Sequence, residues 1–233
     1  MAPGAWDLNL GLQELWDEIN GTSYDWFMPD GFYACIETND KEVIPFKFLD
    51  EEYEVVQAVQ ERPRFHKGLG PNIIHSIDGM IVREMFRRCQ FDPTVTARVA
   101  NLIIEGKGTS DGKSSEMVTD LWEAYLESGF LSCRILDHLY HDTIGIVDPL
   151  VIAKLIQSMP SKSFQLVTVH DCFRCHPNYG NDLRLQYNHI LADINDSKLL
   201  PYIAQQLCGQ KISARKVGHI PREVILNGNY LLG

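Results

Sequence analysis

Five side chains that could bind a metal or take part in catalysis gather within seven residues of this sequence. In the stretch FQLVTVHDCFRCHPNYG, residues 164–180, they are His170, Asp171, Cys172, Cys175 and His176. The last three have the C-x-x-C-H spacing that attaches a c-type haem, and the whole group is a candidate set of metal ligands. A third interpretation starts from the apolar, β-type run at 164–169, which would deliver the His-Asp pair at a turn.

The wider sequence disfavours the haem interpretation. Haem is attached to C-x-x-C-H motifs outside the cytosol, but the N-terminus MAPGAWDLNLGLQELWDEING lacks the charged and apolar regions of a secretion signal. The chain also has no run of about 18 apolar residues that could cross a membrane. We therefore expect a cytoplasmic protein without membrane contact, whose six cysteines are free thiols.

A zinc-binding interaction module remains an alternative. A structural zinc site needs four ligands, usually two pairs separated by a loop. The chain has one C-x-x-C pair, and no second Cys/His pair has comparable spacing. His138 and His141 form an H-x-x-H that is more typical of one face of a helix. A cysteine nucleophile is disfavoured, because its histidine partner is normally distant in sequence and no local signature matches.

The His-Asp pair favours a different metal. A strand that ends in His170-Asp171, followed by a second extended stretch, predicts a β-hairpin with one carboxylate at its turn. Aspartate is a hard oxygen ligand that suits Mg²⁺, which takes few protein carboxylates and leaves other positions to water and substrate phosphates. A turn without any catalytic role could contain the same His-Asp pair, so this interpretation depends on the rest of the chain.

Composition indicates a globular protein that belongs to a larger assembly. The 233 residues are 45% apolar and 22% charged, which is typical of folded domains. The net charge of −10 argues against a free-standing nucleic-acid binder, because phosphate contacts need Lys and Arg. Basic residues cluster locally, at 62–67, at Arg83, Arg87 and Arg88, and at 211–222. Each cluster could equally be a solvated face.

Hydrophobic spacing predicts the elements that must position these residues. Helices are expected at 6–19 and 80–91. Two more are expected to begin at Pro93 and Pro149, each of which follows an aspartate that can cap the helix. A hairpin is expected at 25–49 with its turn at Asn39-Asp40, followed by a short helix or strand at 50–65 and loops at 67–79 and 106–115. A further helix is expected with Ser114 or Ser115 as its cap and its end at Gly129, and a long helix at 181–209 broken near Pro201. The fold class is α+β.

Four segments of the chain resemble motifs of the single-subunit DNA-directed RNA polymerases of bacteriophages and mitochondria, and they follow one another along the chain in the same order as in that family. VTVHDCF (167–173) resembles their third catalytic motif, an apolar strand ending in H-D-x-F/Y. GPNIIHSIDG (70–79) is similar to their P-N-x-x-H-S-x-D segment, WFMPDGF (26–32) to their W-x-x-P-D-G-F element, and IPREVILNGNYLLG (220–233) to their closing segment. The form of 170–188 looks more like phage polymerases with a divided enzyme.

The resemblance implies roles for individual residues. Asp171 would bind Mg²⁺ against the phosphates of the incoming nucleotide, and His170 would shape the turn near the primer end. His75 would approach the hybrid of template DNA and nascent RNA, whereas Asp78 would brace its loop. Asn72 of the same segment and Arg83 of the basic cluster are further nucleic-acid-binding candidates. Cys172 and Cys175 become bystanders.

The resemblance also implies a division of the chain. The distance from Gly79 to His170 is far longer than the single helix usual in the family, so we expect a helical insertion at 90–162. Residues 1–89 would then hold the end of the fingers and the first palm segment. Residues 163–233 would hold the palm hairpin, the following helix and the C-terminal tail, with the palm hairpin packed on helices.

Parts of the family's active site have no counterpart in the sequence. Catalysis by two metals needs carboxylates around both ions, about 4 Å apart, but neither the family's D-x-S-G/C-like motif nor its fingers helix is found. We therefore expect one subunit of a split, heterodimeric phage polymerase, acting in the cytoplasm of the infected host cell with nucleoside triphosphates and a partner chain that carries the fingers and the other aspartate. The alternatives are a non-catalytic scaffold subunit of a polymerase and a fragment of a DNA polymerase, although such enzymes typically continue H-D-E.

Overall fold

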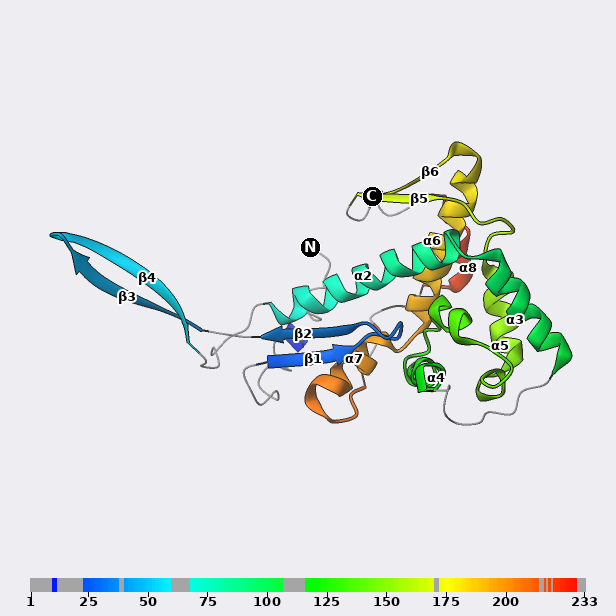
Figure 1. Cartoon of the computed structure of the whole chain (residues 1–233), viewed down its shortest axis with the longest axis horizontal. Helices are drawn as coiled ribbons and strands as arrows, with labels where there is room; N and C mark the ends of the chain where they lie inside the picture. The colour runs from blue at the N-terminus through cyan, green and yellow to red at the C-terminus, as the bar shows by residue number, and fades with distance from the viewer. Residues whose placement is uncertain are drawn as a thin grey trace.

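The computed structural model describes residues 10–11, 23–37, 40–59, 68–106, 116–169, 172–213, 216, 218 and 220–229. This part of the chain is mostly helical and contains three two-stranded antiparallel hairpins, which confirms the α+β class (Figure 1). The helices are α2 (Leu69–Cys89), α3 (Pro93–Glu105), α4 (Glu116–Ser128), α5 (Pro149–Ser158), α6 (Gly180–Asp196), α7 (Leu199–Cys208) and α8 (Arg222–Leu226), with short 3-10 helices η1 (Cys133–His138), η2 (Ile144–Ile146) and η3 (Pro177–Tyr179).

The N-terminal part forms two hairpins in place of the one predicted. β1 (Ser23–Phe27) pairs with β2 (Tyr33–Glu37), and β3 (Asp40–Phe48) pairs with β4 (Glu51–Val59). The predicted turn at Asn39-Asp40 is therefore wrong: Asp40 opens β3, and Asn39 lies outside the described residues. The chain instead reverses at Pro29–Gly31, where Gly31 has a φ of 73°, and again at Leu49-Asp50. The strand alternative for 50–65 is confirmed over β4.

The predicted loop at 67–79 is also wrong, because α2 already begins at Leu69. Pro71 lies in the first turn, where a backbone N–H has no intrahelical acceptor and a proline is therefore tolerated. Ile73 and Met80, seven residues apart, then place buried side chains on one face of the helix, and Met85 and Cys89 are also buried near its end. The apolar spacing continues through the Gly and Pro positions that indicated a loop.

The Asp-Pro helix starts are confirmed. Asp92 accepts a hydrogen bond from the Thr94 backbone N–H at 2.8 Å, and Asp148 accepts one from Leu150 at 2.8 Å. Both prolines occupy the first helical position, where their fixed φ suits the helix. The predicted break near Pro201 occurs earlier, since α6 ends at Asp196 and α7 begins at Leu199.

Two hydrophobic cores lie on either side of the C-terminal end of α2. The first joins β1 and β2 to α2, α6, α7 and the start of β5, with Trp26 and Ile190 fully buried. The buried residues of the second all fall between Val99 and Met159, on α3, α4, α5, η1 and η2. This part is helical as predicted, although Phe130 is buried in the first core.

Several predictions fall on residues that the structure does not describe. Within the predicted helix at 6–19 the described residues are Leu10 and Gly11, which are helical. The predicted loop at 106–115 lies outside the described residues apart from Gly106. Among the helices of the described part, none is long and apolar enough to span a membrane.

Candidate functional site

The third hairpin carries the predicted catalytic pair in its connection. β5 (Leu166–Val169) pairs antiparallel with β6 (Cys172–Cys175), and the register sets Val169 opposite Cys172. The predicted hairpin is therefore confirmed, with two residues between its strands. These two residues, His170 and Asp171, lie outside the described residues, so their assigned roles stay predictions.

Aromatic packing and one backbone bond fix the base of this hairpin. The Phe164 backbone N–H donates to the Cys89 carbonyl at 2.8 Å, which ties the approach to β5 to the end of α2. The Phe164 ring stacks on Tyr179, with ring centroids 4.8 Å apart. On β6 the Phe173 ring contacts Tyr187 of α6 at 5.8 Å. The strands thus extend from a base held by α2 and α6.

The hairpin geometry argues against a metal or haem site at the two cysteines. Side chains alternate between the two faces of a strand, so residues three apart point to opposite sides. Cys172 is exposed and lies opposite Val169, whereas Cys175 is partly buried and lies opposite Leu166. Burial, with a smaller contribution from Asp182, raises the pKa of the Cys175 thiol. Among the described residues no group of three or more His, Cys, Asp or Glu side chains could hold a metal ion.

The nucleic-acid-binding candidates all lie on α2, but their surroundings differ. His75 is exposed on the N-terminal half of the helix. Asn72 is half-buried and donates from Nδ2 to the Tyr24 hydroxyl at 2.9 Å. Asp78 is exposed and helical, so the loop that it was expected to brace is absent. Of these three residues, His75 and Asp78 are exposed, whereas Asn72 is half-buried.

Arg83 already has an acidic partner, Asp30 of the turn between β1 and β2. Its Nε and one terminal nitrogen donate to the two Asp30 carboxylate oxygens at 2.5 and 3.0 Å. The guanidinium carbon also lies 4.2 Å from the centre of the Phe32 ring. Arg83 binding to nucleic acid stays a prediction, and it would have to use a guanidinium that Asp30 holds bidentately.

Asp30 is the centre of a charged cluster that the sequence analysis did not identify. Its side chain is fully buried, and it also accepts from Arg87 at 2.9 Å, while Arg134 donates to its backbone carbonyl at 2.9 Å. Burial alone would raise the pKa of this carboxyl. The hydrogen bonds and charges of Arg83 and Arg87 outweigh burial and hold the pKa below its usual range.

A second buried acid, Glu84, continues the cluster toward η1. Its carboxylate accepts from the Cys133 backbone N–H at 2.9 Å, from Arg87 at 2.7 Å and from the Ser132 hydroxyl. Arg88 of α2 is also fully buried, and it donates to Asp193 of α6 at 2.8 Å. The segment Arg83–Arg88 is therefore a largely neutralised junction between the two cores, and not an open basic patch.

A signal for this cluster was present in the sequence. Arg83 and Arg87 are spaced i, i+4, which places them on one face of a helix. The PDG turn supplies the acid that faces them, but it lies 53 and 57 residues away along the chain. Nothing in the local sequence shows that the two segments meet.

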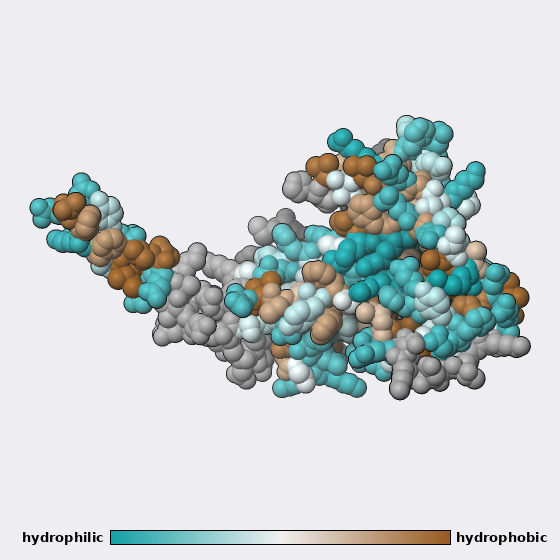
Figure 2. Space-filling model, viewed as in Figure 1, coloured by the Kyte–Doolittle hydropathy of each residue, from teal (hydrophilic) through white to brown (hydrophobic). Residues whose placement is uncertain are grey.

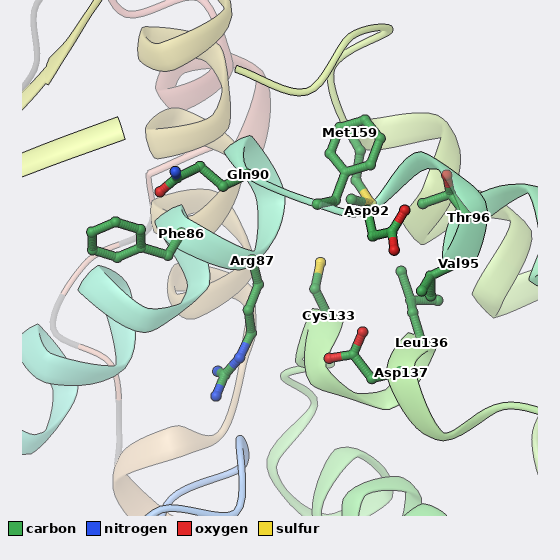
Figure 3. A pocket seen from close by; sticks show the side chains of 11 residues that line it. Phe86, Arg87, Gln90, Asp92, Val95, Thr96, Cys133, Leu136, Asp137 and Met159 are labelled. Carbon is green, nitrogen blue, oxygen red and sulfur yellow. The ribbon is translucent and has the colours of Figure 1, made fainter. Parts of the chain in front are cut away.

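A pocket of 360 Å³ lies beside this junction, between the end of α2, the start of α3 and η1 (Figure 3). Cys133 points into it between Arg87 and Leu136, and the carboxylates of Asp92 and Asp137 lie nearby. Burial raises the pKa of the Cys133 thiol to about 12, so the thiol stays protonated near neutral pH. None of the predicted site residues lines this pocket.

The chain was compared with known proteins. It matches no model of a protein family. No curated protein matches it either.

Proposed function

We propose that this chain is one subunit of a DNA-dependent RNA polymerase and contributes Asp171 to nucleotidyl transfer. The observation that carries the proposal is the β5–β6 hairpin. It is an apolar strand whose two-residue connection is His170-Asp171 and whose base is fixed on α2 and α6. An arrangement of this kind supports a carboxylate held on a rigid element at the tip of a palm hairpin.

The neighbouring elements agree with this placement. In Figure 1 the hairpin runs above α2, and in Figure 2 the surface between the two is hollowed. His75 is exposed on α2, where it would approach the hybrid of template and nascent RNA. Leu166 of β5 is buried in the first core together with residues of α2 and α6, so movement of the hairpin base would require the core to repack.

The donor chemistry at the connection fits Mg²⁺, which prefers carboxylate oxygen. Asp171 would hold the ion, whose charge would neutralise the phosphates of the incoming nucleotide. The 3′-hydroxyl of the RNA attacks the α-phosphorus, a new P–O bond forms, and pyrophosphate leaves. A single carboxylate does not clamp two ions, so the second aspartate and the fingers are assigned to a partner chain.

The test is reconstitution with the chain encoded next to this one. We expect the mixture to make RNA on a DNA template, whereas either chain alone is inactive. Asp171→Asn should lower the rate at least about 10³-fold, because it removes a metal-binding charge at the reacting phosphates. The matched control is Cys172→Ser, an exposed neighbour that should retain nearly full activity.

Full activity of the Asp171→Asn variant would contradict the catalytic role assigned to Asp171. If activity survives this change but deletion of the chain abolishes assembly of the enzyme, the chain is a scaffold subunit. The internal ion pairs of Arg87 and of the buried Arg88 favour this second candidate, because both cations already have acidic partners. Supplying ribonucleotides and deoxyribonucleotides separately decides between RNA and DNA synthesis, and metal analysis of the purified chain tests for zinc.

A further inference from the structure

The hairpin β3–β4 projects from the body of the protein as a separate arm (Figure 1). Its strands pair over nine positions, from Asp40 opposite Val59 to Phe48 opposite Glu51, and no third strand of the described residues joins this sheet. Every side chain described between 42 and 57 is exposed. A two-stranded hairpin without a covering layer is marginally stable in water. We refer to residues 40–59 as the arm.

The two faces of the arm differ in chemistry. Side chains alternate along each strand, and the register places Ile44 opposite Val55, Phe46 opposite Tyr53 and Phe48 opposite Glu51 on one face. The Phe46 and Tyr53 rings stack with centroids 5.6 Å apart. The other face pairs Val43 with Val56, Pro45 with Glu54 and Lys47 with Glu52.

The first face is therefore an apolar strip that no described element covers. Phe46 is 45% exposed and Phe48 60% exposed, and Figure 2 shows hydrophobic surface along the arm. A contiguous apolar surface of this kind on a projecting element is typical of a protein interaction site.

The charge of the arm selects the class of partner. Between residues 42 and 57 the arm carries five carboxylates and one lysine, a net charge of −4. Three of the acids, Asp50, Glu51 and Glu52, follow one another from the tip. Nucleic acid and anionic membranes would be repelled, and a second copy of this chain, at −10, would be repelled as well. The complementary surface is a protein groove that is apolar at its floor and lined by Lys and Arg at its rim.

The conformation of the turn also supports an interaction of the arm with a partner. Leu49 and Asp50 both have positive φ, at 50° and 63°. A two-residue turn of this kind normally takes Asn-Gly, yet here it holds a leucine that is 82% exposed. A strained apolar residue at the tip is explained if the tip inserts into a partner.

We propose that the arm docks by its apolar face into a basic-rimmed groove of the partner polymerase chain. This inference rests on the proposed function, because that function supplies the partner. The docked arm would bury Phe46, Phe48 and Tyr53, and its acidic tip would pair with cations of the groove.

The binding test uses the full-length chain and the chain encoded next to it. Phe46→Thr with Tyr53→Thr removes the aromatic pair and introduces threonines, whose β-branched side chains also suit a strand. We expect this double variant to raise the Kd of the complex about tenfold or more. The matched control is Val43→Thr with Val56→Thr, a cross-strand pair on the opposite face with similar exposure, which should raise it less than about threefold.

The charge of the arm is tested separately. Glu51→Lys with Glu52→Lys should weaken the complex, and the affinity of the wild-type complex should fall as salt is added. Equal Kd values for the aromatic and valine double variants would overturn the inference. An unchanged thermal melting temperature of each free variant shows that the rest of the fold is intact, as expected for changes to side chains that are exposed on the arm.

A photo-crosslinking amino acid at Leu49 identifies what the tip touches. Crosslinks to the partner chain are expected. Crosslinks to template DNA or to a second copy of this chain would overturn the inference in favour of those partners. Loss of RNA synthesis on Asp171→Asn with normal binding by the aromatic double variant would refute the docking role alone. Failure of the wild-type chains to associate would refute both proposals.

Discussion

At the scale of single residues, the described structure is held together by charges that the sequence separates widely. Asp30 is fully buried and joins Arg83, Arg87 and Arg134 from two other segments. Breaking a buried ion pair by removing one partner costs several kcal/mol, because the remaining charge loses its compensation. Asp30 is therefore a structural residue of the PDG motif.

Asp30→Asn is expected to lower the free energy of unfolding by about 3 kcal/mol. The amide keeps the volume of the carboxyl but removes the charge that Arg83 and Arg87 compensate. Chemical denaturation followed by circular dichroism measures the change. Asp120→Asn on the exposed side of α4 is the control, with an expected change within about 0.5 kcal/mol. Equal stability of the two variants would contradict the role assigned to Asp30.

At the scale of elements, local geometry explains both the arm and the helix that the sequence analysis missed. α2 accommodates Pro71 in its first turn, and Gly79 lies beneath Arg83, where an added Cβ would come 3.1 Å from a guanidinium nitrogen. The arm, in contrast, keeps a residue that its own turn disfavours, Leu49 at a positive φ. The packed helix thus accommodates its proline and its glycine, whereas the projecting arm keeps a leucine in a backbone conformation that leucine disfavours.

Leu49→Asn should stabilise the free arm by about 1 kcal/mol, because asparagine tolerates the left-handed region better than leucine. Amide hydrogen exchange of β3 and β4 in the isolated chain reports this as stronger protection. Leu49→Val is the opposite control, since a β-branched side chain is still less suited to a positive φ. Equal protection in both variants would show that the turn is unstrained.

At the scale of the whole molecule, two cores meet at a polar junction. Arg87 bridges Asp30 and Glu84, and Arg88 binds Asp193 of α6, so the end of α2 connects the first core to η1 at the edge of the second. The pocket at this junction is lined by residues of the end of α2 and by residues of α3 and η1. The charge state of the junction therefore affects the stability of the whole described fold.

This junction predicts loss of stability in acid. The pKa of Asp30 is lower in the folded protein than in the unfolded chain, so its contribution is fully present above about pH 5 and is lost as the pH falls below about 4 toward the folded value. Urea denaturation between pH 6 and pH 3 should show the decrease. Asp30→Asn should show a shallower decrease over the same range, and an identical pH profile would contradict the assignment.

The sequence by itself determined the features that depend on neighbouring residues. An apolar, β-type run followed by His-Asp and a second extended stretch predicted the β5–β6 hairpin, and Asp-Pro predicted the starts of α3 and α5. These features follow from local backbone geometry and capping, which a few residues specify.

Only the tertiary structure decided what depends on distant partners. It placed a helix across 69–79, where Gly and Pro indicated a loop, because burial of Ile73 and Met80 outweighs local preference. It also decided that Arg83 and Arg87 bind the buried Asp30, 53 and 57 residues away, and that Arg88 binds the partly exposed Asp193 of α6. No described element covers the apolar strip of the arm. Such outcomes arise from which surfaces meet in space, and sequence spacing does not encode them.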